Sequence, residues 1–135
     1  MPARNELGVA LAAQGKFDEA FSQFPDVIDA EAGIDVASLA WAEARAGKPD
    51  KARAILSRMQ ARAKERYLQA LTMAIAASAA GDKGLALDYI EEGLREHSLG
   101  LVFLRVDPRY DALSQEPRFQ AVLRQVESKY AASVR

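Results

Sequence analysis

The sequence predicts an all-α fold in which about three helical hairpins stack side by side and a C-terminal helix caps the stack. Two observations lead to this prediction. A unit of roughly 34 residues occurs three times along the chain, and such a period is typical of stacked helical hairpins. Half of the residues are hydrophobic but only 7% are aromatic, so small and aliphatic side chains dominate, and alanine favours helices and close packing.

Each copy of the unit is marked by a glycine. Gly15, Gly47 and Gly81 are 32 and then 34 residues apart, and each is followed five residues later by an alanine and nine residues later by a large apolar residue. Because glycine adopts the left-handed conformation that ends many helices, each is expected to close the first helix of a hairpin. The matched positions are Leu7, Gly8, Gly15, Ala20 and Phe24, then Leu39, Ala40, Gly47, Ala52 and Leu56, then Met73, Ala74, Gly81, Ala86 and Ile90.

These units predict a single domain over 1–135, with repeats of about 1–33, 34–66 and 67–98 and a cap over 99–135. Apolar residues at helical spacing place a first helix before Gly15, a second over 17–28, a third over 34–46, a fourth after Pro49, a fifth over 67–80 and a sixth after Gly81. The fourth is expected to bury Ala52, Ile55, Leu56 and Met59. Pro25 predicts a kink or short break, since it removes a backbone donor.

The repeat pattern stops after Ser98. A short apolar stretch follows over 99–106, and then Asp107-Pro108 and Glu116-Pro117 each predict a helix start, with Asp107 as an N-cap. The last helix is expected to bury Phe119, Val122, Leu123 and Val126. A stack of repeats needs an atypical end to cover its terminal apolar face, which fits a cap.

The first copy is similar to the tetratricopeptide (TPR) pattern, in which a Trp, a Leu-Gly pair and a Tyr precede an Ala, a Phe and a Pro. The matching residues are Leu7, Gly8, Leu11 at the Tyr position, Ala20 and Phe24; the departures are Arg4 at the Trp position, Ala32 at the Pro position and, in the second copy, Glu43 at the Tyr position. The resemblance implies a TPR-like, right-handed superhelical stack.

The part from about Leu39 to Val126 resembles a narrower group, the C-terminal TPR tail of bacterial regulatory proteins such as winged-helix regulators, nucleotide cyclases and Ser/Thr kinases. The residues that carry this resemblance are Tyr67, the Gly81-Asp82-Lys83 turn, the phrase Val106-Asp107-Pro108-Arg109-Tyr110-Asp111-Ala112-Leu113, and Pro117-Arg118-Phe119. It implies a bacterial protein–protein interaction scaffold.

Composition excludes several kinds of chemistry. The chain has no cysteine, so disulfides, thiolate catalysis and Cys-ligated zinc are ruled out. The first residues lack the basic and apolar regions of a signal peptide, and no apolar run approaches the roughly 20 residues that span a bilayer. We therefore expect a cytoplasmic protein with no membrane partner. The net charge of −1 gives no general reason to expect nucleic acid.

The sequence also predicts no enzyme, no cofactor and no metal site. His97 is the only histidine, and its helical neighbours Glu91, Glu92 and Glu96 are expected to be solvated. The Gly81-Asp82-Lys83-Gly84 segment is too short for a phosphate-binding loop and predicts a turn between helices.

A binding surface is expected where the first helix of each hairpin lines the concave side of a TPR-like stack. The candidate partner-binding residues are Asn5, Val9, Ser38, Trp41, Arg45, Leu68, Leu71, Thr72, Ile75 and Ser78. This groove is mainly apolar, which suits an amphipathic helix or an extended peptide, and Trp41 is the expected anchor. The alternative, left open by the sequence, is that the chain's own C-terminal helix or a second copy covers these residues.

Charge is unevenly distributed and supports two further hypotheses. Residues 48–66 carry seven basic and two acidic side chains, whereas residues 1–31 carry two basic and six acidic ones. Such asymmetry is expected first of all to mark solvated helix faces. It can also steer another copy of the chain, as in a homodimer, the self-association alternative to peptide binding. The basic row of Lys51, Arg58, Arg62 and Arg66 suggests nucleic acid as a third and least favoured partner, because no aromatic residues interleave with it.

Overall fold

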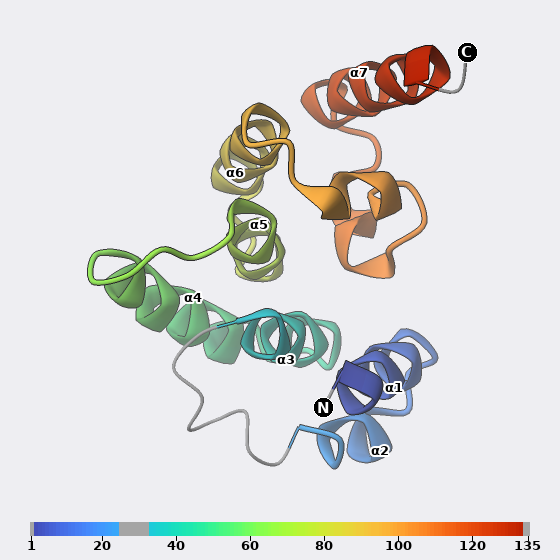
Figure 1. Cartoon of the computed structure of the whole chain (residues 1–135). Helices are drawn as coiled ribbons and strands as arrows, with labels where there is room; N and C mark the ends of the chain where they lie inside the picture. Colours follow the sequence, from blue (N-terminus) through green and yellow to red (C-terminus); the bar gives the residue numbers. More distant parts are fainter. Residues whose placement is uncertain (1, 25–32, 134–135) are drawn as a thin grey trace.

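The computed structural model describes residues 2–24 and 33–133, and every regular element in these two ranges is helical. The predicted all-α fold is confirmed for this part of the chain (Figure 1). The elements are α1 (Pro2–Ala13), α2 (Phe17–Phe21), α3 (Ile34–Arg45), α4 (Pro49–Ala63), α5 (Ala70–Ala79), α6 (Lys83–Arg95), the 3-10 helices η1 (Leu99–Phe103) and η2 (Pro108–Leu113), and α7 (Pro117–Ser133).

Consecutive helices pack as pairs, and the pairs pack on one another. Helix α1 packs on α2, α3 on α4, and α5 on α6. The first helices of the pairs also touch in order, since α3 lies between α1 and α5 (Figure 1). Helix α7 packs on α6, while η1 and η2, drawn in orange, connect α6 to α7 and lie beside α5.

Glycine ends the first helix of each pair, as predicted. Gly15, Gly47 and Gly81 have φ angles of 81°, 84° and 88°. In each case the next residue donates its N–H to a carbonyl five positions earlier, at 2.9 to 3.0 Å. This hydrogen-bond pattern is the Schellman motif, which satisfies the last carbonyls of a helix while the chain turns sharply.

Buried alanines allow the helices to approach closely. Ala20, Ala52 and Ala86, which follow the three glycines by five residues, are fully buried. Every residue of α5 from Ala70 to Ser78 is buried, because α3, α4, α6 and η2 surround this helix. The apolar residues predicted to be buried on α4 and α7 are all in the core, as expected: Ala52, Ile55, Leu56, Met59, Phe119, Val122, Leu123 and Val126.

Two helices differ from the prediction. Helix α2 ends at Phe21, earlier than expected, and residues 25–28 of the predicted segment, Pro25 included, lie outside the described residues. Helix α5 begins at Ala70 and not at 67. The Tyr67 hydroxyl donates to the Glu96 carboxylate at 3.1 Å, a contact with the end of α6 that holds this aromatic residue outside α5.

The segment after Ser98 also differs in detail. The predicted start at Asp107-Pro108 is present, and Asp107 accepts a hydrogen bond from the Arg109 N–H at 2.9 Å, which confirms its N-cap role. The helix that follows is a 3-10 helix. The predicted start at Pro117 is confirmed as the first residue of α7.

One helix contact explains a variation within the repeat. A Cβ atom added at Gly8 would lie 2.5 Å from the Cζ atom of Phe24, which is far too close. The matching positions of the second and third copies pair a fully buried alanine with a smaller apolar residue, Leu56 or Ile90. Across the three copies, the glycine thus occurs with the largest apolar side chain and the alanines with the smaller ones, as close packing requires.

We predict that Gly8→Ala lowers the free energy of unfolding by about 1–3 kcal/mol, because the added methyl overlaps the Phe24 ring. Alanine is the better helix former, so helix propensity alone predicts the opposite sign. The double variant Gly8→Ala/Phe24→Leu has the residue pair of the second copy. Its loss of unfolding free energy should be smaller than the sum of the losses of the two single variants. Urea unfolding followed by circular dichroism checks this cycle, and an additive result would contradict the contact.

Candidate functional site

The chain itself covers much of the face that was expected to bind a partner. Six of the predicted residues lie on α3 and α5, and the side chain of each is at most 9% exposed: Ser38, Trp41, Leu71, Thr72, Ile75 and Ser78. We call this surface the inner face. The element packed against it is η2, whereas α7, the C-terminal helix considered from the sequence, packs on α6.

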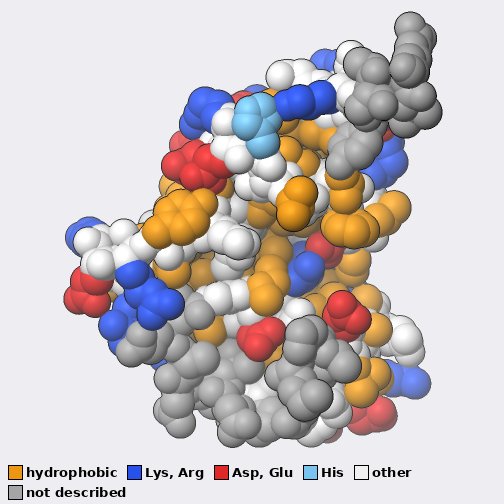
Figure 2. All heavy atoms as spheres, in the orientation of Figure 1, with side chains coloured by type: hydrophobic (Ala, Val, Ile, Leu, Met, Phe, Trp, Pro, Cys, Tyr) orange, Lys and Arg blue, Asp and Glu red, His pale blue; other side chains and the backbone are white. Residues whose placement is uncertain are grey.

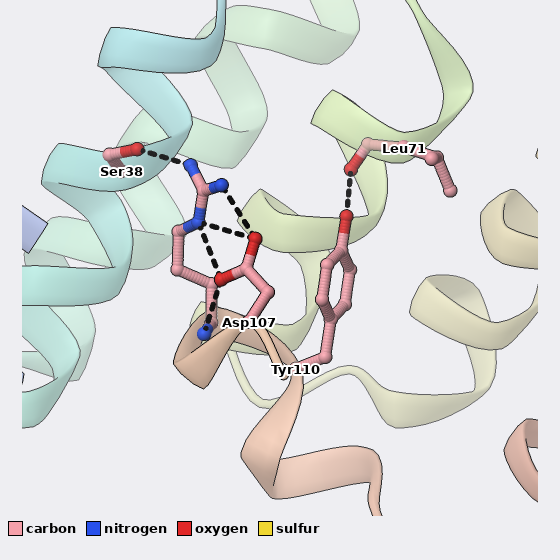
Figure 3. Close-up of polar contacts among 5 residues, drawn as sticks. Ser38, Leu71, Asp107 and Tyr110 are labelled. Carbon is pink, nitrogen blue, oxygen red and sulfur yellow. Dashed lines mark hydrogen bonds and ion pairs between the residues drawn. The ribbon is translucent and has the colours of Figure 1, made fainter. Parts of the chain in front are cut away.

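An ion pair from the start of η2 reaches the inner face. The Arg109 guanidinium donates to both carboxylate oxygens of Asp107 at 2.6 to 3.2 Å, and its Nη1 donates to the Ser38 hydroxyl at 2.8 Å (Figure 3). The Arg109 and Asp107 side chains are only 16% and 12% exposed. The pair therefore fixes η2 to α3 with charge-assisted bonds in a largely dry environment.

Tyr110 fixes η2 to α5 and α7. Its hydroxyl points to the Leu71 carbonyl at 3.5 Å, a long hydrogen bond (Figure 3). Its ring packs on that of Phe119 with 6.4 Å between the ring centroids. Burial raises the pKa of the Tyr110 hydroxyl above its ordinary value, with a further rise from the Asp107 carboxylate, because the ionised phenolate would be poorly solvated here.

Trp41, the anchor expected from the sequence, is almost completely covered by the chain itself. Its indole is 7% exposed, and the Arg45 guanidinium lies 5.4 Å from the ring centre. Arg45 also donates to the carbonyls of Ala12 and Ala13 at 3.2 and 3.1 Å. Because Arg45 both covers the indole and satisfies carbonyls at the end of α1, it joins the first and second hairpins.

The remaining predicted residues lie elsewhere. Asn5 and Val9 on α1 and Leu68 before α5 are partly buried, and none of them lines either of the two cavities on the inner face. The first of these cavities, of about 200 Å³, lies beside Trp41, Arg45 and Ser78 at one end of η2. The predicted residues therefore fall into three groups. Trp41, Arg45 and Ser78 line this first cavity, Leu71, Thr72 and Ile75 line the second, and the others line neither: Asn5, Val9, Ser38 and Leu68.

The second cavity on this face is open and strongly apolar at its edge. It has a volume of about 310 Å³ and lies where the start of α5 meets η1 and η2, with Leu71, Thr72 and Ile75 among its lining residues. Four large exposed apolar side chains line it as well: Ile34, Tyr67, Leu99 and Phe103. We call these seven residues the apolar groove. On this face, hydrophobic side chains surround a hollow in which charged groups are visible (Figure 2).

The exposure of Leu99 and Phe103 follows from the geometry of η1. Side chains three residues apart overlie one another in a 3-10 helix, and here Leu101 and Leu104 turn into the core. The neighbouring side chains must then point outward, so Leu99 is 87% and Phe103 is 60% exposed. The apolar stretch over 99–106 was visible in the sequence, and the three-residue spacing of Leu101 and Leu104 is the signal that identifies which residues face solvent.

The charged residues that line the same cavity give it a net negative charge. Arg109 and Asp107 neutralise each other, and the remaining charged lining residue is Glu96, which accepts from Tyr67. The groove thus combines an apolar edge with one uncompensated carboxylate. Such a site fits an apolar segment that carries a basic group.

Within residues 2–24 and 33–133, no group of three or more His, Asp or Glu side chains has an arrangement that holds a metal ion. No helix in these ranges has the length and hydrophobicity to cross a bilayer. No protein-family model, curated protein or solved structure matches the chain. The site is therefore interpreted from its own geometry.

We predict that Arg109→Gln destabilises the protein by about 2–3 kcal/mol, because Asp107 then loses its partner in a largely buried position. Arg118→Gln is the matched control. Arg118 also pairs with two carboxylates, Asp88 and Glu91, but it is 43% exposed, so its loss should cost clearly less. Urea unfolding of the two variants decides the point, and equal losses would contradict a special role for the Arg109 pair.

We predict that stability falls as the pH rises above 10.0, the ordinary pKa of tyrosine, partly because of Tyr110. Above that pH the unfolded chain loses the phenol proton while the native state retains it, so the unfolded state is favoured. The contribution of Tyr110 approaches about 1.4 kcal/mol per pH unit. Urea unfolding between pH about 8 and about 11 should give a flatter profile for Tyr110→Phe than for the wild type. Parallel profiles would show that Tyr110 ionises as easily in the native state as in the unfolded one.

Proposed function

We propose that this chain is a non-enzymatic interaction module that binds an apolar segment of a partner protein in the apolar groove. The observation that carries the proposal is the set of four large apolar side chains, 41% to 87% exposed, around a cavity of about 310 Å³. Contiguous exposed apolar surface is uncommon on soluble proteins and marks interaction sites. The cavity provides the depth that an anchoring side chain needs.

The finer architecture belongs to the same proposal. Paired helices, glycine corners and buried alanines support a TPR-like, right-handed superhelical stack. The resemblance of 39–126 to the TPR tails of bacterial regulatory proteins supports a bacterial, cytoplasmic module that recruits other proteins. In this interpretation η2 occupies the part of the inner face near Ser38 and Trp41, and the partner binds next to it, in the apolar groove.

The chemistry of the groove favours a particular partner segment. Its edge is apolar, so it accepts one or two large apolar side chains. Glu96 is the uncompensated charge in the lining, so a lysine or arginine next to those side chains gains a favourable interaction. The preferred ligand is therefore a short helical or extended segment with adjacent apolar and basic residues.

Self-association through the same groove is less favourable. In a two-fold symmetric dimer the same surface of both copies forms the interface, and residues near the symmetry axis contact their own counterparts. Two grooves placed face to face would bring two Glu96 carboxylates together, which costs free energy. This consideration favours a different protein as the partner.

A selection from a random peptide library displayed on phage tests the proposal with defined ligands. Enriched peptides should combine apolar and basic residues, and their synthetic forms should bind the purified protein in fluorescence polarisation measurements. Phe103→Ser should weaken binding by about tenfold or more, since it removes an apolar anchor at the edge of the groove. Leu7→Ser is the matched control, because Leu7 is also large, apolar and 48% exposed but lies on α1.

Three results would overturn the proposal. The first is that no peptide is enriched above background. The second is that Leu7→Ser and Phe103→Ser reduce binding equally. The third is a protein that light scattering shows to be a dimer across the accessible concentration range and that Phe103→Ser converts to a monomer, which would assign the groove to self-association.

A further inference from the structure

A separate cavity lies between the end of α6, η1 and α7. Its volume is about 290 Å³, and five aliphatic side chains line it, those of Leu94, Leu99, Leu101, Val102 and Val126. The other lining residues are His97, Ser98 and Lys129. Although Ser98 and Leu99 also line the apolar groove, the rest of the lining differs, and here it includes no carboxylate.

His97 has an unusual backbone conformation at this cavity. It ends α6 with a φ of 57°, at the position where α1, α3 and α5 have glycine. The Schellman motif is complete here as well, because the Ser98 N–H donates to the Gly93 carbonyl at 3.0 Å. A residue with a side chain in this conformation is strained, and such strain is concentrated at functional sites. The strain points to a use for the imidazole at this corner.

The imidazole meets Lys129 of α7. The Lys129 Nζ atom lies 2.7 Å from the His97 Nδ1 atom. An ammonium group only donates, so Nδ1 is the acceptor and the imidazole proton is on Nε2. This contact positions the ammonium group and leaves it two further N–H donors. His97 is therefore a positioning residue for the charge of Lys129.

Within the described residues, no carboxylate forms an ion pair with the Lys129 ammonium. Glu127, two residues before Lys129, pairs with Arg105, and Glu96, next to His97, accepts from the neutral Tyr67 hydroxyl and forms no ion pair with Lys129. A cationic group thus lies beside an aliphatic wall, with a hydroxyl and an imidazole at the same end. On the face shown in Figure 2, the pale blue histidine side chain lies next to a basic side chain, with hydrophobic side chains nearby.

We propose that this cavity binds a medium-chain acyl carboxylate, with its chain among the five aliphatic residues and its carboxylate on the Lys129 ammonium. Opposite charge and apolar surface are adjacent here, which is the arrangement that an anionic amphiphile requires. A peptide fits less well, because its backbone would place N–H and C=O groups along the wall formed by the five aliphatic side chains, which offer no hydrogen-bond partners. This site is distinct from the proposed function of the apolar groove.

Titration with sodium decanoate below its micelle concentration tests the proposal. Two-dimensional 1H–15N NMR spectra of the full chain should show shifts concentrated at Leu94, Leu101, Val126 and Lys129. Affinity should rise by about two- to fourfold per methylene from hexanoate to decanoate, as expected when each added group is buried. Decanol, which has the chain without the charge, should bind more weakly than decanoate by about fivefold or more.

Substitutions separate this site from general charge effects. Lys129→Gln should weaken decanoate binding by about fivefold or more. Arg124→Gln, on the same helix but outside the lining, removes the same charge and should change binding by less than about twofold. Phe103→Ser, the groove variant, should leave decanoate binding unchanged, so that failure of one site is not mistaken for failure of the other.

The proposal is overturned if decanol binds as tightly as decanoate, or if Lys129→Gln and Arg124→Gln have equal effects. It is also overturned if the shifts map to the apolar groove and disappear in Phe103→Ser. A C-terminal peptide such as acetyl-Ala-Ala-Leu with a free carboxylate, if it binds more tightly than decanoate and shifts the same residues, would assign the cavity to a protein partner.

Discussion

The docking of η2 on the inner face depends on one polar contact, in which Arg109 joins Asp107 to Ser38 of α3. Arg109 and Ser38 are 71 residues apart, and both the arginine and its partner Asp107 are largely buried. Aliphatic side chains hold η2 against α5 without fixing its orientation, because apolar burial has no direction. The planar guanidinium supplies the direction, since it binds one carboxylate through two donors and a hydroxyl through a third.

This docking of η2 has a consequence for the surface. The chain must travel from the end of α6 to the inner face within a few residues, and it does so as a 3-10 helix. Such a helix has three residues per turn, so it buries one narrow row of side chains and exposes the others. Leu101 and Leu104 form the buried row, and Leu99 and Phe103 are left in solvent beside the open cavity. While η2 covers one part of the inner face, η1, which leads to it, supplies the apolar edge of the groove beside it.

The parts of the structure that sequence could predict are those set by local rules. Gly15, Gly47 and Gly81, the N-cap Asp107 and the helix start at Pro117 each depend on a few neighbouring residues. Which element covers Trp41 depends instead on contacts between distant segments, and repeat position alone does not give this. The early end of α2 and the late start of α5 were missed as well, because most helical stability comes from tertiary packing and local spacing does not fix the first and last turns. Leu99 and Phe103, the residues that η1 contributes to the candidate site, lie in the non-repeating part, where no period was available to align them.

The two cavities near Leu99 suggest why the last repeat differs from the others. A glycine at the end of α6 would complete the corner without strain, as it does at the ends of α1, α3 and α5. The chain has His97 there, and the imidazole contacts Lys129 from the helix that follows. The cap thus has polar contacts at both of its ends, Arg109 with α3 and Lys129 with the end of α6. Between them, the exposed apolar side chains of η1 separate a groove with an uncompensated carboxylate from a cavity with an uncompensated ammonium group, so the two sites select ligands of opposite charge.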